Sequence, residues 1–246
     1  MTELASVFPS ALQRVRRLPL SRDQLMLLMI AVNEIFLGID TYLSHIISGT
    51  IVPREWIPIV FGFVSGVALL FAGLIALRNR TLASILATVT LVLSIGVGLL
   101  GAYFHISYAA HPFAPAGERL TLDLLVWAPP VLGPMAFALA GVLGISAAWI
   151  ESPADSGRLI LWGDRAIQLP YSKTRAYFFI VGMGILAALI SSVLDHARTG
   201  YDSPWLWVLP AVGIFAMVVA VVMGSLSAPS RFDVWTYIAA MLLLIV

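Results

Sequence analysis

Ionisable side chains lie inside apolar segments of this sequence, and these residues are the first candidates for chemistry. The segment from Leu37 to Gly49 carries Asp40 and His45, and Glu34 precedes it in the same apolar run. An ionisable group at the centre of a membrane helix costs roughly 2.5–3.5 kcal/mol on insertion scales, so it faces protein or water and usually serves a function. Glu34 and Asp40 are therefore candidate proton-handling residues.

Three of the four histidines lie near the ends of apolar runs. These are His45, His105 and His196, whereas His111 lies in the segment after the second of them. Neutral imidazole ligates haem iron and copper. The first three are candidate cofactor-binding residues for haem b or a quinone, and His45, His105 and His111 are candidate metal ligands, for example for copper. The alternative is that they are helix-end residues bonded to loops, since no HExxH or HxH pattern occurs.

The spacing of Glu34 and His45 places both side chains on one face of a helix. Eleven residues at 100° per residue bring them within about 20° of each other, some 16 Å apart along the axis. We expect Glu34 near the middle of the membrane, facing the helix bundle, and His45 near the outer surface. Gly38 and Thr41 lie between them and would line a polar path. Asp40 points about 140° away from His45, and helix packing is its alternative role.

The composition is that of a membrane protein. Of the 246 residues, 60% are hydrophobic and 11% are charged, and the mean hydropathy is +0.97, whereas a soluble domain has about 25% charged residues. The net charge of +1 gives no indication of a nucleic-acid partner. The absence of cysteine excludes disulfides, Cys-ligated zinc and iron–sulfur clusters on this chain. The expected partners are the lipid bilayer and other membrane subunits of a larger complex.

Apolar runs of membrane-spanning length predict an all-α, polytopic integral membrane helix bundle with about seven transmembrane helices. Proline interrupts one of these runs: Pro129, Pro130 and Pro134 either break a helix at membrane depth or belong to an outer loop that continues through Pro130, which we favour. We expect the seventh run to continue beyond Val246. The runs are 24–47, 56–77, 82–109, 122–150, 175–196, 204–226 and a shorter one from Phe232.

The distribution of Lys and Arg predicts the topology. With the N-terminus in the cytoplasm, the inner segments hold 11 basic residues and the outer segments hold three, Arg54, Arg119 and Arg198. This arrangement predicts a cytoplasmic tail at 1–22, a four-helix membrane unit at 23–150, a cytoplasmic connecting loop at 151–174 and a second membrane unit at 175–246. A hairpin with a Gly-Asp turn is predicted in the connecting loop. The expected location is the bacterial inner membrane.

A comparison of the sequence with itself at an offset of 151 residues indicates a tandem repeat. The number of helices per unit would be four, so the two repeats would be parallel, with the second incomplete. Glu34 and Asp40 correspond to Ile185 and Ser191, so any site that uses the acids belongs to the first half only. The matched pairs are Leu43 with Leu194, His45 with His196, Gly49 with Gly200, Trp56 with Trp207, Gly62 with Gly213, and Gly73 with Gly224.

The third run contains a face of small residues. Ser94, Gly98, Gly101 and His105 recur at spacings of four, three and four, which permits close approach of another helix or leaves room for a flat macrocycle beside a ligating histidine. We favour helix packing. The GxGxxG pattern from Gly96 is not a dinucleotide site, because that motif requires a preceding strand.

These features predict a membrane-embedded accessory or anchor subunit of a respiratory or photosynthetic electron-transfer complex. The histidines would hold haem b or copper, or border a quinone pocket, and the chain would not be catalytic alone. A second interpretation is a transporter or channel that uses Glu34 and Asp40. A third is a purely structural membrane subunit.

Overall fold

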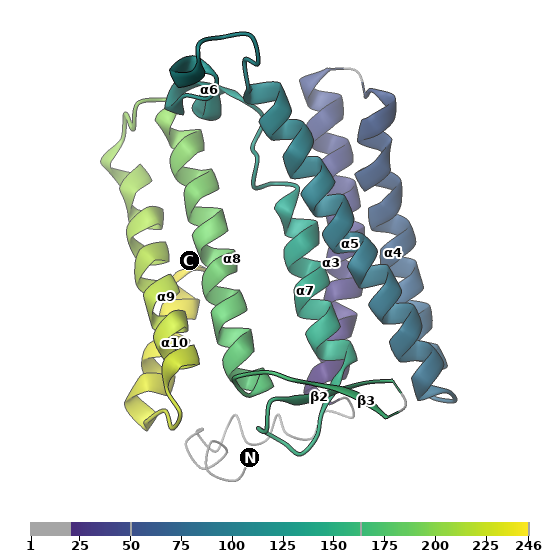
Figure 1. Ribbon diagram of the computed structural model, residues 1–246. Coiled ribbons are helices and arrows are strands. Elements are labelled where there is room, and N and C mark those ends of the chain that lie inside the picture. Colours follow the sequence, from purple (N-terminus) through teal and green to yellow (C-terminus); the bar gives the residue numbers. More distant parts are fainter. Residues whose placement is uncertain (1–20, 50, 163, 246) are drawn as a thin grey trace.

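The structure, a computed structural model, describes residues 21–49, 51–162 and 164–245. Five helices are long and apolar enough to cross a membrane, so the chain is a multi-pass integral membrane helix bundle (Figure 1). The predicted tail, 1–22, lies almost entirely outside the described residues. The five helices are α3 (Arg22–Ser48), α4 (Trp56–Ile75), α5 (Arg80–Ala109), α8 (Lys173–Ala197) and α9 (Val208–Ser225).

Three further helices in the described part of the chain are shorter, so the predicted count of seven full spans is not confirmed. The run 122–150 is interrupted: α6 (Leu122–Trp127) is followed by a non-helical segment, and α7 (Met135–Ala148) begins only after Pro134. A 14-residue helix rises about 21 Å, which is less than the roughly 30 Å hydrocarbon core. The seventh run forms α10 (Arg231–Leu243), of 13 residues.

A three-stranded antiparallel sheet lies at the end of the bundle where α3 begins (Figure 1). Strands β2 (Arg158–Trp162) and β3 (Arg165–Gln168) form the predicted hairpin, and β1 (Ile150–Glu151) adds an edge strand that was not predicted. The predicted Gly-Asp turn includes residue 163, which lies outside the described residues. We call this end of the bundle the sheet end and the opposite end the α6 end.

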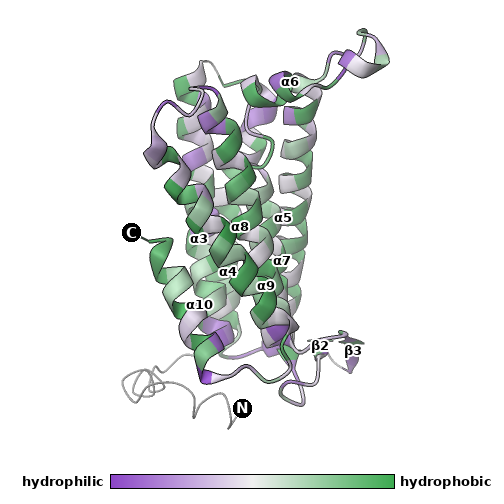
Figure 2. Cartoon of the chain, turned by 90° about the vertical axis from the view of Figure 1, so that its left-hand side faces the viewer, coloured by the Kyte–Doolittle hydropathy of each residue, from purple (hydrophilic) through white to green (hydrophobic). Residues whose placement is uncertain are grey.

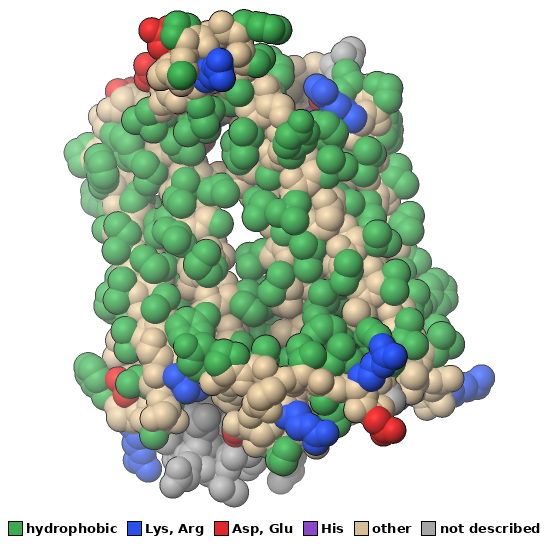
Figure 3. Space-filling view, viewed as in Figure 1, with side chains coloured by type: hydrophobic (Ala, Val, Ile, Leu, Met, Phe, Trp, Pro, Cys, Tyr) green, Lys and Arg blue, Asp and Glu red, His purple; other side chains and the backbone are tan. Residues whose placement is uncertain are grey.

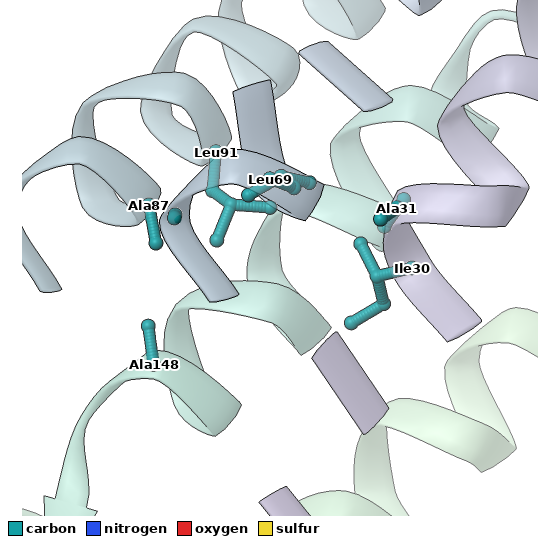
Figure 4. Close-up of a cluster of buried hydrophobic side chains, with 8 residues drawn as sticks. Ile30, Ala31, Leu69, Ala87, Leu91 and Ala148 are labelled. Carbon is teal, nitrogen blue, oxygen red and sulfur yellow. The ribbon is translucent and has the colours of Figure 1, made fainter. Parts of the chain in front are cut away.

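The helices form two groups. In the first bundle, α3 packs against α4 and α7, and α5 packs against α4 and α7; in the second bundle, α9 packs against α8 and α10. The core of the first bundle is built from small and branched apolar side chains (Figure 4). These are Ile30, Ala31, Leu69, Ala72, Ala87, Leu91, Ala140 and Ala148.

Several corresponding elements of the two bundles begin 151 residues apart, whereas α4 and α9 begin 152 residues apart. Helices α3 and α8 begin at Arg22 and Lys173 after serine N-caps, and α5 and α10 begin at Arg80 and Arg231. The 3-10 turns η2 (Pro53–Glu55) and η4 (Pro204–Trp207), which precede α4 and α9, begin with prolines at the same offset. The element boundaries therefore follow the spacing of the sequence matches.

The exterior has the layout expected of a bilayer protein. Hydrophobic residues cover the helices at mid-height (Figure 2), and several Lys and Arg side chains gather at the sheet end (Figure 3). A third short 3-10 turn, η3 (Ala116–Glu118), lies in the loop at the α6 end. Because little polar surface covers the middle of the helices, lipid is the environment that these faces suit.

Candidate functional site

A pocket opens at the α6 end of the first bundle, between α3, α4, α5 and the non-helical segment 128–134. Its volume is about 360 Å³, near the lower end of the 300–1,000 Å³ typical of small-molecule sites. We call it the histidine pocket. Most of its wall is apolar and includes Leu37, Val97, Phe104 and Phe137, and its polar members include Asp40, Ser44, His45, Arg54, Glu55, His105 and Tyr108.

His45 and His105 come together in this pocket, from α3 and α5. Their ring centroids lie 6.4 Å apart, with 58° between the ring planes. Nδ1 of His45 lies 2.7 Å from the backbone oxygen of Thr41, and Nδ1 of His105 lies 2.9 Å from that of Pro130. A carbonyl can only accept a hydrogen bond, so both Nδ1 atoms carry hydrogen. In the neutral ring this leaves each Nε2 as a lone-pair acceptor.

The other two histidines lie apart from this pair. His111 is exposed in the loop that follows α5, where its backbone N–H donates to Arg119. His196 ends α8 in the second bundle and packs edge-on against Tyr201, with ring centroids 6.0 Å apart. Among the described residues, no group of three or more His, Cys, Asp or Glu side chains is placed to hold a metal ion.

Glu34 is buried within the first bundle, with none of its surface exposed, which confirms that it faces other helices. Its carboxyl group joins two neighbouring helices: Ser65 Oγ of α4 lies 2.7 Å from Oε2, and Ser94 Oγ of α5 lies 2.6 Å from Oε1. Ser94 Oγ also lies 2.8 Å from the backbone oxygen of Phe137 in α7. The network thus connects all four helices of the first bundle.

A count of hydrogens indicates the form of this carboxyl group. Ser65 and Ser94 each carry one hydroxyl hydrogen, but each lies within bonding distance of two acceptors, one on Glu34 and one backbone carbonyl. If Glu34 is the neutral acid, it donates to Ser94, which is then free to donate to the oxygen of Phe137. Because the carboxyl is fully buried and the described residues give it no cationic partner, a charge there would be costly, and we expect the neutral acid.

The predicted path from Glu34 along Gly38 to His45 is closed by α4. A Cβ atom on Gly38 would lie 3.0 Å from the backbone oxygen of Ile59, so the α4 backbone covers this face of α3. Phe137 is shared by the Glu34 network and the histidine pocket, because its carbonyl accepts from Ser94 and the residue lines the pocket. Asp40, the other predicted acid, is exposed and also lines that pocket.

Sequence reasoning missed the two charged residues that the turn before α4 adds to the pocket. Arg54 and Glu55 lie in the 3-10 turn before α4; the Arg54 guanidinium lies 5.3 Å from the ring centre of Phe104, and Glu55 accepts a hydrogen bond from Val52 N–H. A usable signal was present in the sequence, since these are the two charged residues directly before a run that begins with an interfacial tryptophan, Trp56.

The chain has no significant match among protein-family models, curated proteins or solved structures. Its function is therefore argued from the site itself.

Proposed function

We propose that the protein binds the headgroup of a quinone or quinol in the histidine pocket, as a membrane-embedded accessory subunit of an electron-transfer assembly. The observation that carries the proposal is the paired imidazoles of His45 and His105, both fixed by backbone carbonyls within one mainly apolar pocket. Apolar walls with a few placed polar groups are the usual design of a small-molecule site.

The chemistry of the pair suits this ligand class. A neutral imidazole Nε2 accepts a hydrogen bond from a quinol hydroxyl, and the protonated ring donates to a quinone carbonyl. Asp40 and Glu55 in the same wall are additional acceptors for a released proton. The volume of about 360 Å³ suits a single ring, whose apolar tail would leave the pocket for the lipid.

Haem b or copper is the second ligand class for this site. Imidazole nitrogen is a donor for both metals, and metal-bound histidines usually donate their other N–H to a carbonyl or carboxylate, as His45 and His105 do here. We rank the quinone first because the volume of about 360 Å³ suits a single ring better than a macrocycle, and because two imidazole nitrogens are fewer than the three ligands of a typical copper site. An absorbance spectrum and a metal analysis of the purified protein distinguish the classes: a Soret band or bound copper overturns the ranking.

The proposal is tested by titrating the protein in nanodiscs with a short-chain benzoquinol and following tryptophan fluorescence. His45→Ala and His105→Ala should each weaken binding by about tenfold or more, equivalent to about 1.4 kcal/mol. His196→Ala is the matched control, because this residue has the same position in the second bundle and should leave affinity unchanged. Wild-type protein without saturable binding, or an equal loss in His196→Ala, contradicts the proposal.

We also propose that the two bundles arose by duplication and that the sheet end faces the cytoplasm of a bacterial inner membrane. The offset of 151 residues between the starts of α3 and α8, and of α5 and α10, supports the first point, and the concentration of basic residues at the sheet end supports the second. The chain has no cysteine, so single cysteines at Ser156 and Gly117 can be labelled cleanly. A membrane-impermeant maleimide added to intact cells should label position 117 and not position 156.

A transporter that uses Glu34 and Asp40 is the second candidate function, and the burial of Glu34 among four helices favours it. Glu34→Gln keeps the shape of the neutral acid but cannot release a proton. Proton-coupled uptake into proteoliposomes that is lost in this variant would support transport over quinol binding.

A further inference from the structure

A crevice separates the two bundles at the α6 end. It has a volume of about 460 Å³ and lies between α8 and the non-helical segment after α6. In the space-filling view, openings pass between the side chains of the two groups of helices (Figure 3). The crevice exists because α7 begins only at Met135, so no helix fills the space beside the outer half of α8. We call it the interbundle crevice.

The mouth of the interbundle crevice carries one positive and one negative side chain. Arg198 crosses to the first bundle, where Nε donates to the backbone oxygen of Val126 and Nη2 donates to that of Ala128, at 2.7 and 2.8 Å. Its Nη1 lies 3.6 Å from Asp195 Oδ1, and the Asp195 side chain is 69% exposed. Nη1 and the Asp195 carboxylate are therefore still open to further charged partners.

Two serine hydroxyls lie deeper in the crevice. Ser191 and Ser192 of α8 both line it, and neither hydroxyl has a hydrogen-bond partner among residues 21–49, 51–162 and 164–245. Serines in helices usually bond the carbonyl of the preceding turn when nothing else is available, as Ser48 and Ser225 do here. An unpaired hydroxyl facing hydrocarbon loses free energy, so these two positions suit a ligand with acceptor oxygens.

The remaining wall is apolar. Leu125, Val131 and Leu132 form one side, and Ala188 and Leu194 form the other. A ligand that contacts every part of the crevice therefore needs a headgroup with one positive and one negative charge, acceptor oxygens next to this headgroup, and a hydrocarbon chain. Separate free ions or a soluble metabolite would leave the apolar wall uncovered.

We propose that the interbundle crevice binds one phosphatidylethanolamine molecule from the adjacent leaflet. Its phosphate pairs with Arg198, its ammonium group pairs with Asp195, its ester oxygens accept from Ser191 and Ser192, and one acyl chain fills the apolar wall. The charges of Arg198 and Asp195 cancel, so the mouth favours a zwitterionic headgroup over an anionic one such as phosphatidylglycerol. An ammonium donates hydrogen bonds to a carboxylate, which a choline headgroup cannot do.

This lipid site is distinct from the histidine pocket. Pro130 contributes to both walls, but one cavity faces α3 and α5 whereas the other faces α8. The lipid proposal therefore does not depend on quinol binding. The bound lipid would join the two bundles where they have few direct contacts.

Native mass spectrometry of delipidated protein, incubated with phosphatidylethanolamine, phosphatidylglycerol or an equal mixture, tests the proposal. Wild-type protein should retain one phosphatidylethanolamine and prefer it over phosphatidylglycerol by about tenfold or more. Leu132→Trp, which fills the crevice, and the double variant Ser191→Val with Ser192→Val should each reduce retention by a similar factor. Arg119→Gln is the control, because Arg119 also donates to a backbone carbonyl at the α6 end but lies outside the crevice.

Asp195→Asn provides the sharpest measurement, since it leaves Arg198 without an acidic neighbour. This variant should bind phosphatidylglycerol better than phosphatidylethanolamine, which reverses the preference without removing the crevice. Equal retention of both lipids by the wild type, unchanged selectivity in Asp195→Asn, or unchanged retention in Leu132→Trp would each overturn the proposal. So would a copurified protein subunit that cross-links to residues of the crevice in the native membrane.

Discussion

Helix pairs α3–α4 and α8–α9 pack in the same register but bury different chemistry. Gly62 of α4 lies against Gly38 of α3, and Gly213 of α9 lies against Leu189 of α8, with both members of each pair shifted by 151 residues. The two pairs differ at a nearby position: α3 has Glu34, with its buried carboxyl group, whereas the corresponding residue of α8 is Ile185. Helix packing and polar chemistry are therefore specified by different residues of the same helices.

The histidines show the same contrast. His45 of α3 meets His105 across the histidine pocket. His196 occupies the same position in α8, but it packs against Tyr201, which itself stacks on Trp207 with ring centroids 4.2 Å apart. A histidine at a helix end thus forms part of a pocket only where a second helix brings a partner and no aromatic side chain occupies the space.

The largest expected effect on stability comes from a difference in burial between the first residues of α3 and α8. Lys173 is 99% buried and lies 2.7 Å from Asp23, whereas Arg22, at the same position in the first bundle, is 46% exposed. Lys173→Met should destabilise the protein by about 3 kcal/mol, because it removes the buried cation of the pair and leaves Asp23 only the longer contact, 3.7 Å, with Arg22 Nε. Arg22→Met should cost less than about 1 kcal/mol. Thermal unfolding in detergent measures both, and equal losses would contradict the comparison.

A second contrast concerns the two helix-crossing glycines. A Cβ on Gly62 would lie 2.6 Å from the backbone oxygen of Glu34 and 2.7 Å from Gly38 Cα, whereas a Cβ on Gly213 would meet only the side chain of Leu189. Gly62→Ala should therefore destabilise by about 1–3 kcal/mol. In Gly213→Ala, the leucine can move and the better helix propensity of alanine, worth about 1 kcal/mol, offsets the crowding. A Gly213→Ala midpoint as low as that of Gly62→Ala would show that the crossings are equally tight.

The third contrast tests the carboxyl that only the first bundle contains. Glu34→Gln preserves one donor and one acceptor toward Ser94 and Ser65, so stability should change by less than about 1 kcal/mol. Glu34→Ala removes both bonds and leaves a cavity, which should cost about 2 kcal/mol. Infrared spectra of the wild type should contain a carbonyl band from a buried neutral acid that is lost in Glu34→Gln. A carboxylate band in its place would show that Glu34 is ionised.

The sequence was sufficient for features that depend on local patterns. Apolar runs located the five long helices, and the pattern around Gly157 predicted the β2–β3 hairpin. The prolines indicated an interruption, but the favoured helix start at Pro130 was too early, because α7 begins only at Met135. Helical periodicity also placed Glu34 on a buried face. These predictions depend only on residues close together in the chain.

The remaining features depend on contacts between distant residues. Ser65 and Ser94 become partners of Glu34 only because the folded bundle brings α4 and α5 to the depth of this residue. Lys173 is the only lysine in the chain, yet its partner, Asp23, is 150 residues away. Sequence periodicity gives the face of a helix but not which helix covers it, so these partners could not be predicted.

Photolabelling measures most directly whether the first bundle alone carries the functional site. A photoreactive short-chain benzoquinone, applied to the protein in nanodiscs and mapped by peptide mass spectrometry, should label α3, α5 and the 128–134 segment around His45 and His105. Excess unlabelled quinol should remove this labelling, and His45→Ala should reduce it by about tenfold, whereas His196→Ala should not. Competable labelling on α8 or α9, or labelling that quinol does not displace, would contradict the account.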